Sequence, residues 1–223
     1  MKSEEQGLDG PRQPPASGGK AKQLVVLLHG LGADGNDLIS LAPLLAEALP
    51  DAGFLSPHAP FPCDMAPMGR QWFSLQDMSM ERMLEGAETA TPLLNAFLDA
   101  ELAAHDLRPQ DLALLGFSQG TMMALHVGLR RAEGLAAIIG FSGLLIAPSR
   151  LSREIAARPP VTLVHGTDDM VVPFQAMEMA EKGLEAAGVR VESFARPGLA
   201  HGIDQEGLTI AALHLQRAFS GSS

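Results

Sequence analysis

The sequence predicts a single α/β domain with a mostly parallel sheet that helices cover on both faces. Its 223 residues, 46% of them hydrophobic, are enough for one substantial core and too few for two full domains. Short apolar runs alternate with longer amphipathic stretches, which is the order of strands and helices in a parallel sheet. No internal repeat and no insertion large enough for a separate cap domain interrupts this order.

Each expected element follows from its hydrophobic pattern. Apolar runs of about four to eight residues bounded by turn residues are typical of buried strands, and apolar residues at helical spacing are typical of helices that cover a sheet. The expected strands are 24–28, 53–56, 111–115, 135–140, 161–165 and 189–195. The expected helices are 37–49, 80–105, 119–131, 174–187 and 205–219, with a short one at 149–157.

The first 22 residues differ in composition from the rest of the chain. They hold three prolines and several glycines with almost no periodic apolar signal. Such a segment cannot bury enough apolar surface to fold by itself. We therefore expect a flexible or surface-draped arm over residues 1–22 and a single folded domain over residues 23–223.

Composition also limits the partners and the compartment. The single cysteine, Cys63, excludes an intramolecular disulfide and fits the reducing cytoplasm. No apolar run approaches the roughly 18 residues that span a bilayer, and the arm lacks the pattern of a signal peptide. A net charge of −10 disfavours binding to nucleic acid and to anionic membranes. We expect a cytoplasmic protein with no nucleic-acid partner and no stable membrane anchor.

The most informative motif is Gly116-Phe117-Ser118-Gln119-Gly120, which stands between an expected strand and an expected helix. A Gly-x-Ser-x-Gly turn in this context is a nucleophile elbow, whose strained conformation projects the serine hydroxyl above the sheet. Its two glycines let the turn close without a clash at Cβ. Ser118 is therefore the predicted nucleophile.

Polar residues follow four of the expected strands. His29, Ser118, the pair Asp168 and Asp169, and His201 each come after such a run. Ligand sites of parallel sheets form outside the carboxyl ends of the strands. The sequence thus predicts one site at that edge.

A serine hydroxyl is a weak nucleophile at neutral pH and needs a base, usually a histidine that a carboxylate orients. In hydrolases with an elbow of this kind, the acid and then the histidine follow the serine along the chain. Four histidines follow Ser118, but His126 and His214 lie inside expected helices, and His165 precedes the candidate acids. His201 lies in the loop before the last helix, where reach and mobility suit a proton carrier. His201 is the predicted base.

The candidate acids are adjacent in the turn 165–173. Asp168 could instead accept backbone hydrogen bonds in the turn, and Asp169 could instead cap the following helix. Spacing alone does not separate the two. Asp204 is a third carboxylate, but its place at a helix start fits interaction with the helix dipole better.

An oxyanion hole requires backbone N–H groups that are in place before the reaction. The first expected strand ends in a glycine-rich turn, 29–37, which matches neither a dinucleotide-binding fingerprint nor a P-loop. In elbow hydrolases one N–H group comes from the residue after the nucleophile and the other from this loop. These groups are Gln119 and, by position, Leu31. The chemistry requires no metal and no organic cofactor.

At these residues the chain resembles the phospholipase/carboxylesterase family of serine α/β-hydrolases, over nearly everything after the arm. The resemblance implies the α/β-hydrolase fold without a large cap domain. It also assigns the acid to Asp169, four residues before Pro173, and supports Leu31 and Gln119 as oxyanion donors. The matching segments are His29-Gly30-Leu31-Gly32 with Gly35, Gly116-Phe117-Ser118-Gln119-Gly120, His165-Gly166 with Asp169 and Val172-Pro173, and Gly198 with His201-Gly202.

The same resemblance implies a substrate pocket and a homodimer. The pocket residues are Trp72, Phe73, Phe141, Met170 and Val171, although Trp72, the only tryptophan, could equally well fill the core. Relatives usually carry an aspartate where this chain has Ser74, and the chain lacks both an N-terminal cysteine for lipidation and a strongly apolar lid. Small soluble esters are therefore the expected substrates.

The resulting hypothesis is a serine carboxylesterase that hydrolyses small to medium acyl esters through an acyl-enzyme on Ser118. Thioesters and lysophospholipids are further candidate substrates. One alternative is a lactonase similar to dienelactone hydrolase, although Ser118 stands where that enzyme would carry a cysteine. Another is a noncatalytic binding protein with a hydrolase fold, which would be expected to have lost a member of the triad.

Overall fold

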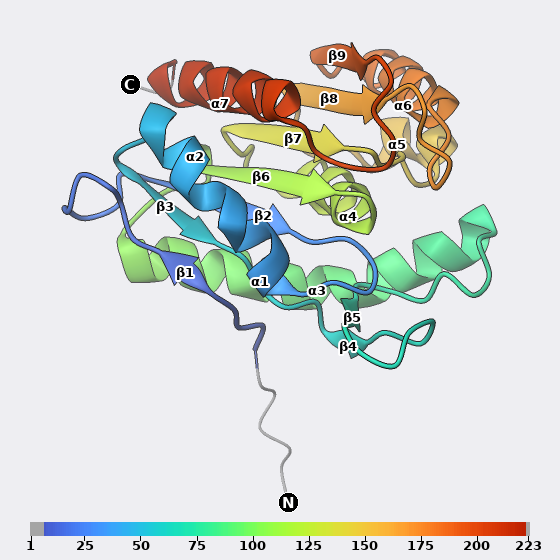
Figure 1. Ribbon diagram of the computed structural model, residues 1–223, viewed down its shortest axis with the longest axis horizontal. Helices are drawn as coiled ribbons and strands as arrows, with labels where there is room; N and C mark the ends of the chain where they lie inside the picture. The colour runs from blue at the N-terminus through green and yellow to red at the C-terminus, as the bar shows by residue number, and fades with distance from the viewer. Residues whose placement is uncertain (1–6, 222–223) are drawn as a thin grey trace, which may run out of the picture.

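A computed structural model describes residues 7–221, so residues 1–6 of the predicted arm and residues 222–223 lie outside the described part. A seven-stranded sheet forms its centre, in the order β1-β3-β2-β6-β7-β8-β9 (Figure 1). All neighbours pair in parallel except β1, which runs antiparallel to β3. The strands are β1 (Arg12–Gln13), β2 (Gln23–Leu28), β3 (Ala52–Leu55), β6 (Leu112–Phe117), β7 (Ala137–Phe141), β8 (Val161–Gly166) and β9 (Val191–Arg196).

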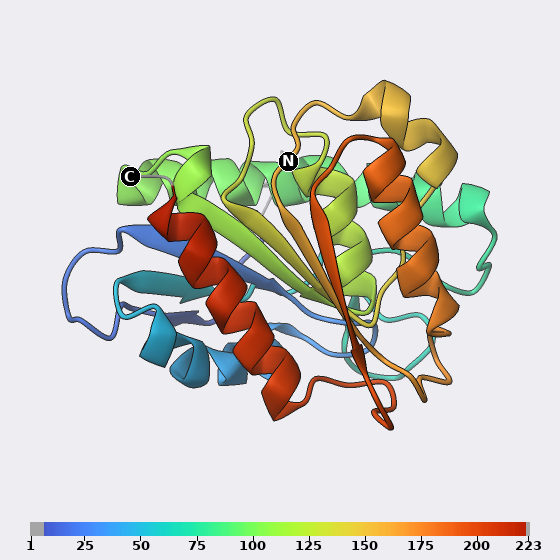
Figure 2. The same cartoon turned by 90° about the horizontal axis from the view of Figure 1, so that it is seen from above.

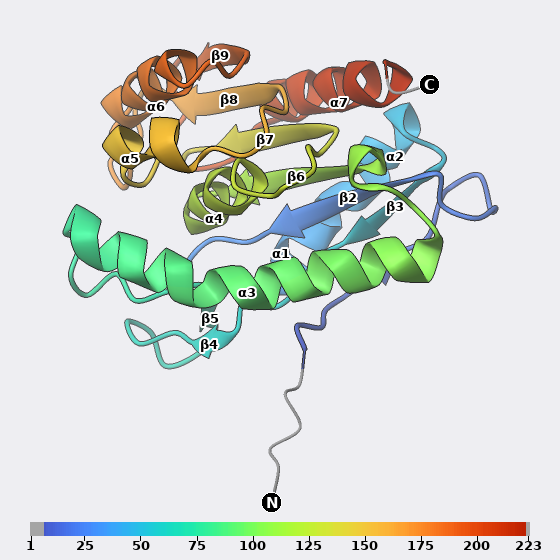
Figure 3. The ribbon, with the colours of Figure 1, turned by 180° about the vertical axis from the view of Figure 1, so that it is seen from behind.

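Helices cover both faces of this sheet, as the view from above shows (Figure 2). One face carries α1 (Gly35–Leu38), the 3₁₀ turn η1 (Ile39–Leu41), α2 (Ala42–Ala48) and α7 (Gln205–Ser220). The opposite face carries α3 (Met80–His105), α4 (Gln119–Gly128), α5 (Pro148–Glu154) and α6 (Gln175–Ala186) (Figure 3). A further 3₁₀ turn, η2 (Pro109–Asp111), precedes β6. Two apolar cores result, one on each face, which is the layered arrangement of an α/β-hydrolase fold.

The six expected strands are confirmed to within a few residues, and α3 begins and ends where predicted. The structure also has three strands that the sequence did not predict: β1, β4 (Phe61–Pro62) and β5 (Arg70–Gln71). Each is two residues long, too short to carry a periodic pattern. β4 and β5 pair with each other in a separate antiparallel ribbon.

The single helix predicted over residues 37–49 is wrong. The structure divides this segment into α1, η1 and α2. Pro43 lies in the first turn of α2 and has no N–H group to continue a ladder from the preceding turn. The apolar spacing persists through the break, so the pattern alone looked continuous.

The described part of the predicted arm is attached to the sheet. Arg12 and Gln13 pair with Leu55 and Phe54 as the edge strand β1. The Arg12 guanidinium also lies 2.7 Å from the buried carboxylate of Glu101 in α3. The sheet therefore begins before the boundary that we expected at residue 23. Within residues 7–221, no helix is long and apolar enough to cross a membrane.

Candidate active site

The elbow between β6 and α4 has the conformation that its sequence predicts. Ser118 adopts φ 52° and ψ −116°, a positive φ that L-residues rarely take. A Cβ at Gly116 would lie 2.4 Å from the backbone of Gly120 and Thr121, and one at Gly120 would overlap the carbonyl oxygen of Leu28. Only glycine fits at these two positions, which explains why they flank the serine.

Hydrogen bonds from the neighbouring strand hold the elbow in place. The Ser118 N–H donates to the carbonyl oxygen of Phe141 at the end of β7, at 2.9 Å. The Thr121 hydroxyl lies 2.8 Å from both that oxygen and the carbonyl oxygen of Gly116. Ser118 is the N-cap residue of α4, yet its hydroxyl does not cap the helix. The side chain is thus left for the cavity above the sheet, which it lines.

Asp169 is the carboxylate that faces His201. Its Oδ2 lies 2.7 Å from His201 Nδ1. Its Oδ1 accepts hydrogen bonds from the N–H groups of Val171 and Val172, at 2.9 and 2.8 Å. The residue is only 5% exposed. The turn after β8 therefore fixes this carboxylate before any substrate arrives.

The two other candidate acids have different partners. Asp168 is exposed and accepts a hydrogen bond from the Thr167 hydroxyl at 2.9 Å. Asp204 is the N-cap of α7, where it accepts from the N–H of Gly207 and pairs with Arg196 at 2.9 Å. The turn after β8, which the hydrogen bond from the Asp169 N–H to the Gly166 carbonyl closes at 3.4 Å, leaves Asp168 exposed and buries Asp169.

Two opposing effects act on the pKa of Asp169. Burial by itself would raise the pKa, since it disfavours the charged form. The hydrogen bonds from His201 and from the N–H groups of Val172 and Val171 outweigh it. The net result is a pKa below the ordinary value for aspartate, so this carboxylate stays ionised at neutral pH.

His201 lies in the loop between β9 and α7. Because its Nδ1 faces the Asp169 carboxylate, that nitrogen carries a proton and leaves Nε2 as the proton acceptor. Its ring packs against Phe117, with the ring centroids 4.8 Å apart. His201 and Ser118 line the same cavity. The structure thus brings Ser118, His201 and Asp169 to one place from three strand ends.

The other two late histidines lie away from this cavity. His126 is buried within α4, where its Nδ1 has no hydrogen-bond partner among the described residues. His214 in α7 pairs with the Thr162 hydroxyl at 2.9 Å. Neither lines the cavity beside Ser118.

His165 has a place in the site that sequence reasoning missed. Its Nε2 lies 2.8 Å from the carbonyl oxygen of Val172 and 3.3 Å from Oδ2 of Asp169. Since both neighbours are acceptors, this nitrogen carries the ring proton. The side chain is 2% exposed and packs edge-on against Phe174. The signal available in sequence was only its position four residues before Asp169.

The two expected oxyanion donors lie beside Ser118. Gln119 is the first residue of α4, where a backbone N–H has no partner within the helix. Leu31 lines the cavity that holds Ser118. Two backbone hydrogen bonds fix the loop after Leu31: Gly32 N–H to the Arg70 carbonyl at 2.9 Å, and Arg70 N–H to the Ala33 carbonyl at 2.8 Å.

The cavity beside Ser118, called here the acyl cavity, has a volume of about 280 Å³. Its wall is mostly aliphatic and sulfur-containing. Of the five expected pocket residues, only Val171 lines it. The lining residues are Gly30, Leu31, Leu75, Met78, Met83, Phe117, Ser118, Met122, Leu144, Val171, Val172, Pro173, Ala176 and His201.

The other four expected pocket residues lie elsewhere. Trp72, Phe73 and Phe141 are at most 2% exposed and belong to the core, whereas Met170 is 92% exposed and does not line the cavity. The Trp72 indole N–H donates to the His29 carbonyl at 3.0 Å. These aromatic residues support the loops around the cavity and do not form its wall, because large side chains next to the sheet are drawn into the core.

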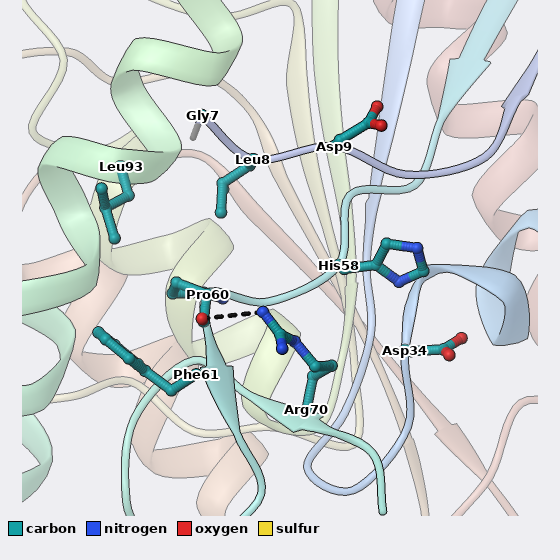
Figure 4. Close-up of a pocket in the computed structure, with 9 residues that line it drawn as sticks. All are labelled: Gly7, Leu8, Asp9, Asp34, His58, Pro60, Phe61, Arg70 and Leu93. Atoms are coloured by element: carbon teal, nitrogen blue, oxygen red, sulfur yellow. Dashed lines mark hydrogen bonds between the residues drawn. The ribbon is translucent and has the colours of Figure 1, made fainter. Parts of the chain in front are cut away.

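A larger cavity, of about 630 Å³, lies away from Ser118 (Figure 4). His58 lies there between Asp9 and Asp34, and Arg70 bonds to the Pro60 carbonyl at 2.9 Å. His58 Nδ1 accepts the Gly35 N–H at 3.1 Å, so this ring supports the start of α1. The cavity contains none of the triad residues. Within the described chain, no group of three or more His, Cys, Asp or Glu side chains could hold a metal ion.

Comparison with known proteins places the chain among esterases. The sequence profile of the Phospholipase/Carboxylesterase family matches residues 15–219. The chain is 29% identical over 219 residues to carboxylesterase SOBER1 of Arabidopsis thaliana, covering 91% of this chain and 93% of that protein. It is 32% identical over 195 residues to acyl-protein thioesterase 1 of Schizosaccharomyces pombe, covering 82% and 84%. The solved structure of esterase PE8 superimposes with a TM-score of 0.91 at 46% identity, covering 95% and 99%.

Proposed function

The chain belongs to the phospholipase/carboxylesterase family, and on that premise we propose that Ser118 carries the acyl group while the enzyme hydrolyses carboxylic esters. The family membership makes the protein a carboxylic ester hydrolase. What the proposal adds is the role of each residue. The observation that carries the proposal is the 2.7 Å contact between Asp169 Oδ2 and His201 Nδ1. His201 lines the same cavity as Ser118, whose backbone is strained.

In the acylation step, His201 Nε2 takes the proton of the Ser118 hydroxyl as Oγ attacks the ester carbonyl. The backbone N–H groups of Leu31 and Gln119 donate to the oxyanion of the tetrahedral intermediate. His201 then gives its proton to the departing oxygen or sulfur. Water repeats the path in the second half-reaction and releases the acid, which restores the free serine.

Asp169 has two tasks in this cycle. Its Oδ2 holds His201 in the tautomer that exposes Nε2, and its charge stabilises the imidazolium that forms when Nε2 takes the proton. The lowered pKa of Asp169 keeps this carboxylate ionised through the cycle. Asp169 therefore acts through His201 and does not touch the substrate.

The proposed substrates are esters of small to medium acyl groups. A cavity of about 280 Å³ lies just below the roughly 300–1,000 Å³ typical of ligand pockets. Its methionines, Met78, Met83 and Met122, suit acyl chains of variable shape because the thioether side chain is flexible. The acyl-protein thioesterase among the relatives supports thioesters as further substrates.

The proposed nucleophile is tested by replacing Ser118 with alanine. Turnover of a short-chain ester should fall by roughly 10⁴-fold or more, because the covalent route is lost. A fluorophosphonate probe should label the wild-type protein at Ser118 and leave the variant unlabelled. Ser149→Ala is the matched control, since Ser149 is exposed on α5 and far from the elbow along the chain. Near-normal turnover or labelling in Ser118→Ala would contradict the proposal.

We also propose a cytoplasmic location and a homodimer. The single cysteine supports the first, and the family resemblance supports the second. Light scattering on the purified full chain distinguishes a dimer from the 23.5 kDa monomer. A monomer at micromolar concentration would contradict the dimer.

A further inference from the structure

A second cavity, called here the leaving-group cavity, adjoins His201 on the side of α1. Its volume is about 290 Å³. Its apolar lining comes from Leu38 in α1 and Leu41 in η1, and from Phe117 at the end of β6 and Ile203 before α7. In Figure 1, α1 and the segment that leads into α7 lie on the same face of the sheet. Two segments far apart in sequence therefore border an open, partly apolar cavity next to the proposed base.

The acyl cavity and the leaving-group cavity share two residues, His201 and Phe117. The rings of these residues are in contact, at 4.8 Å between centroids. Ser118 and Leu31 line only the acyl cavity. The ring pair is thus a boundary, with the nucleophile and an oxyanion donor on one side.

The chemistry of the proposed function assigns a different part of the ester to each side. The carbonyl carbon must meet Ser118 Oγ, and its oxygen must meet the N–H groups of Leu31 and Gln119, so the acyl group occupies the acyl cavity. The departing atom must lie beside His201, because that ring gives it a proton. The group attached to the departing atom then continues past His201.

We propose that the leaving-group cavity binds the alcohol or thiol part of the substrate, and that it favours apolar groups of about one ring in size. The inference rests on the proposed function and adds a specificity subsite to it. The half-buried side chains of Leu41, Phe117 and Ile203 supply the apolar contact surface, and Leu38, only 4% exposed, adds little. The exposed carboxylate of Asp37 stands among the lining residues and disfavours leaving groups that carry a negative charge.

The site works in both directions of the acyl transfer. In acylation, the bond between the carbonyl carbon and the leaving oxygen breaks, and His201 protonates the leaving alcohol. In the reverse step, an alcohol in the cavity gives its proton to His201, attacks the acyl-enzyme and forms a new ester, while the proton returns to Ser118 Oγ. An alcohol that binds in the cavity should therefore compete with water for the acyl-enzyme.

The test compares methyl butyrate with benzyl butyrate, which share an acyl group and differ in the leaving group. Ser40→Trp places a large side chain at the leaving-group cavity from an exposed position. Leu44→Trp is the matched control, one helical turn further along on α2, exposed, and outside both cavities. In Ser40→Trp the ratio of kcat/KM for the benzyl ester to that for the methyl ester should fall about tenfold or more. The control should leave this ratio unchanged.

A second readout does not depend on the acylation step. With methyl butyrate as the acyl donor and added benzyl alcohol, the wild-type enzyme should form benzyl butyrate alongside butyric acid. Ser40→Trp should lower that ester-to-acid ratio by about the same factor. Leu41→Ala shortens a side chain that lines the cavity and so enlarges it. This variant should shift the preference of the enzyme toward esters of bulkier alcohols.

These measurements separate the inference from the proposed function. If Ser40→Trp and Leu44→Trp give the same two ratios, the subsite does not exist, while Ser118 labelling still supports the nucleophile. A change in acyl chain-length preference in Ser40→Trp, measured with methyl hexanoate against methyl butyrate, would overturn the assignment of the cavities. Circular dichroism checks that the variants are folded, and if Ser40→Trp is not, Leu41→Ala decides the question by its effect on the preference for bulky alcohols.

Discussion

Asp168 and Asp169 are neighbours in sequence, yet their carboxylates have unrelated surroundings. Asp169 is buried and takes hydrogen bonds from two backbone N–H groups and from His201. Asp168 is exposed, and its side chain accepts from Thr167. The turn after β8 thus decides which of the two carboxylates can orient His201.

Asp169→Asn should lower kcat by about 10³- to 10⁴-fold. The amide no longer fixes the tautomer of His201, and it carries no negative charge to stabilise the imidazolium. Asp168→Asn should change kcat by no more than about twofold, because the Asp168 side chain is exposed and its replacement should change neither the stability nor the activation free energy much. Steady-state kinetics on a short-chain ester measures both. Comparable losses in the two variants would show that the acid is misassigned.

His165 should act as a positioning residue for Asp169. Replacing it by leucine removes the N–H that lies 3.3 Å from Oδ2 and should lower kcat by up to about 100-fold as the carboxylate shifts. His165→Gln keeps an N–H donor and should restore most of the activity. The proton resonance of His201 Nδ1, measured by NMR, should move in the leucine variant, which a loss of packing alone would not cause. An unmoved resonance would contradict the role.

At the scale of elements, the short segment 70–73 joins the two halves of the proposed oxyanion hole. Arg70 pairs through its backbone with the loop after Leu31. Further along the segment, the Gln119 side chain accepts the Trp72 N–H at 2.9 Å and donates to the Phe73 carbonyl at 2.7 Å. The side chain of Gln119 thus links its own backbone N–H, through segment 70–73, to the loop that carries the Leu31 N–H.

Gln119→Leu should keep the backbone donor and lose these two hydrogen bonds. The buried Trp72 N–H and Phe73 carbonyl would be left without partners, which should lower the free energy of unfolding by roughly 2–4 kcal/mol. Urea unfolding measures this loss. Gln76→Leu is the control, because Gln76 is exposed and its side-chain amide makes one long hydrogen bond, at 3.4 Å, to the Asp64 carbonyl. An unchanged midpoint for Gln119→Leu would contradict the bracing role.

At the scale of the whole molecule, α4 lies between the sheet and α3, and each of its residues is buried. His126 is enclosed there with Nδ1 unpaired among the described residues. Burial, with a smaller effect of the nearby Arg130, lowers the pKa of His126 from 6.5 to about 4. The folded protein therefore resists protonation at this ring, whereas the unfolded chain takes up a proton below about pH 6.5.

The free energy of unfolding should consequently fall as the pH drops from about 6.5 toward 4, since the unfolded state binds the extra proton. The contribution of His126 amounts to about 3 kcal/mol between pH 7 and pH 4. His126→Gln should remove this part of the pH dependence. Urea unfolding of both proteins at several pH values checks it, and parallel pH curves would show that His126 does not cause the loss.

Much of the fold could be predicted because its signals are local. The strand runs and the pattern of α3 appear directly in the order of apolar residues, and Gly116 and Gly120 mark the elbow by a steric need. The break at Pro43 and the two-residue strand β1 were missed. In the first case the apolar spacing hid the break, and in the second the pairing partner is Leu55, more than forty residues away.

The substrate pocket was the part of the candidate site least open to prediction. Trp72, Phe73 and Phe141 were expected in the pocket, but their side chains are buried in the core of the protein. Met83 and Met122, which do line the acyl cavity, lie on two different helices, and no local pattern marks them. Which side of a helix borders a cavity depends on how the helices pack.

The sequence by itself determined the order of elements, the elbow and the set of residues that stand at strand ends, because backbone sterics and hydrophobic periodicity act over a few residues. Only the tertiary structure decided that Asp169 faces His201, that His165 lies behind that carboxylate, and that a cavity lies on each side of the base. The physical reason is that these contacts join strand ends brought together by parallel pairing, and their distances depend on how both layers of helices pack against the sheet.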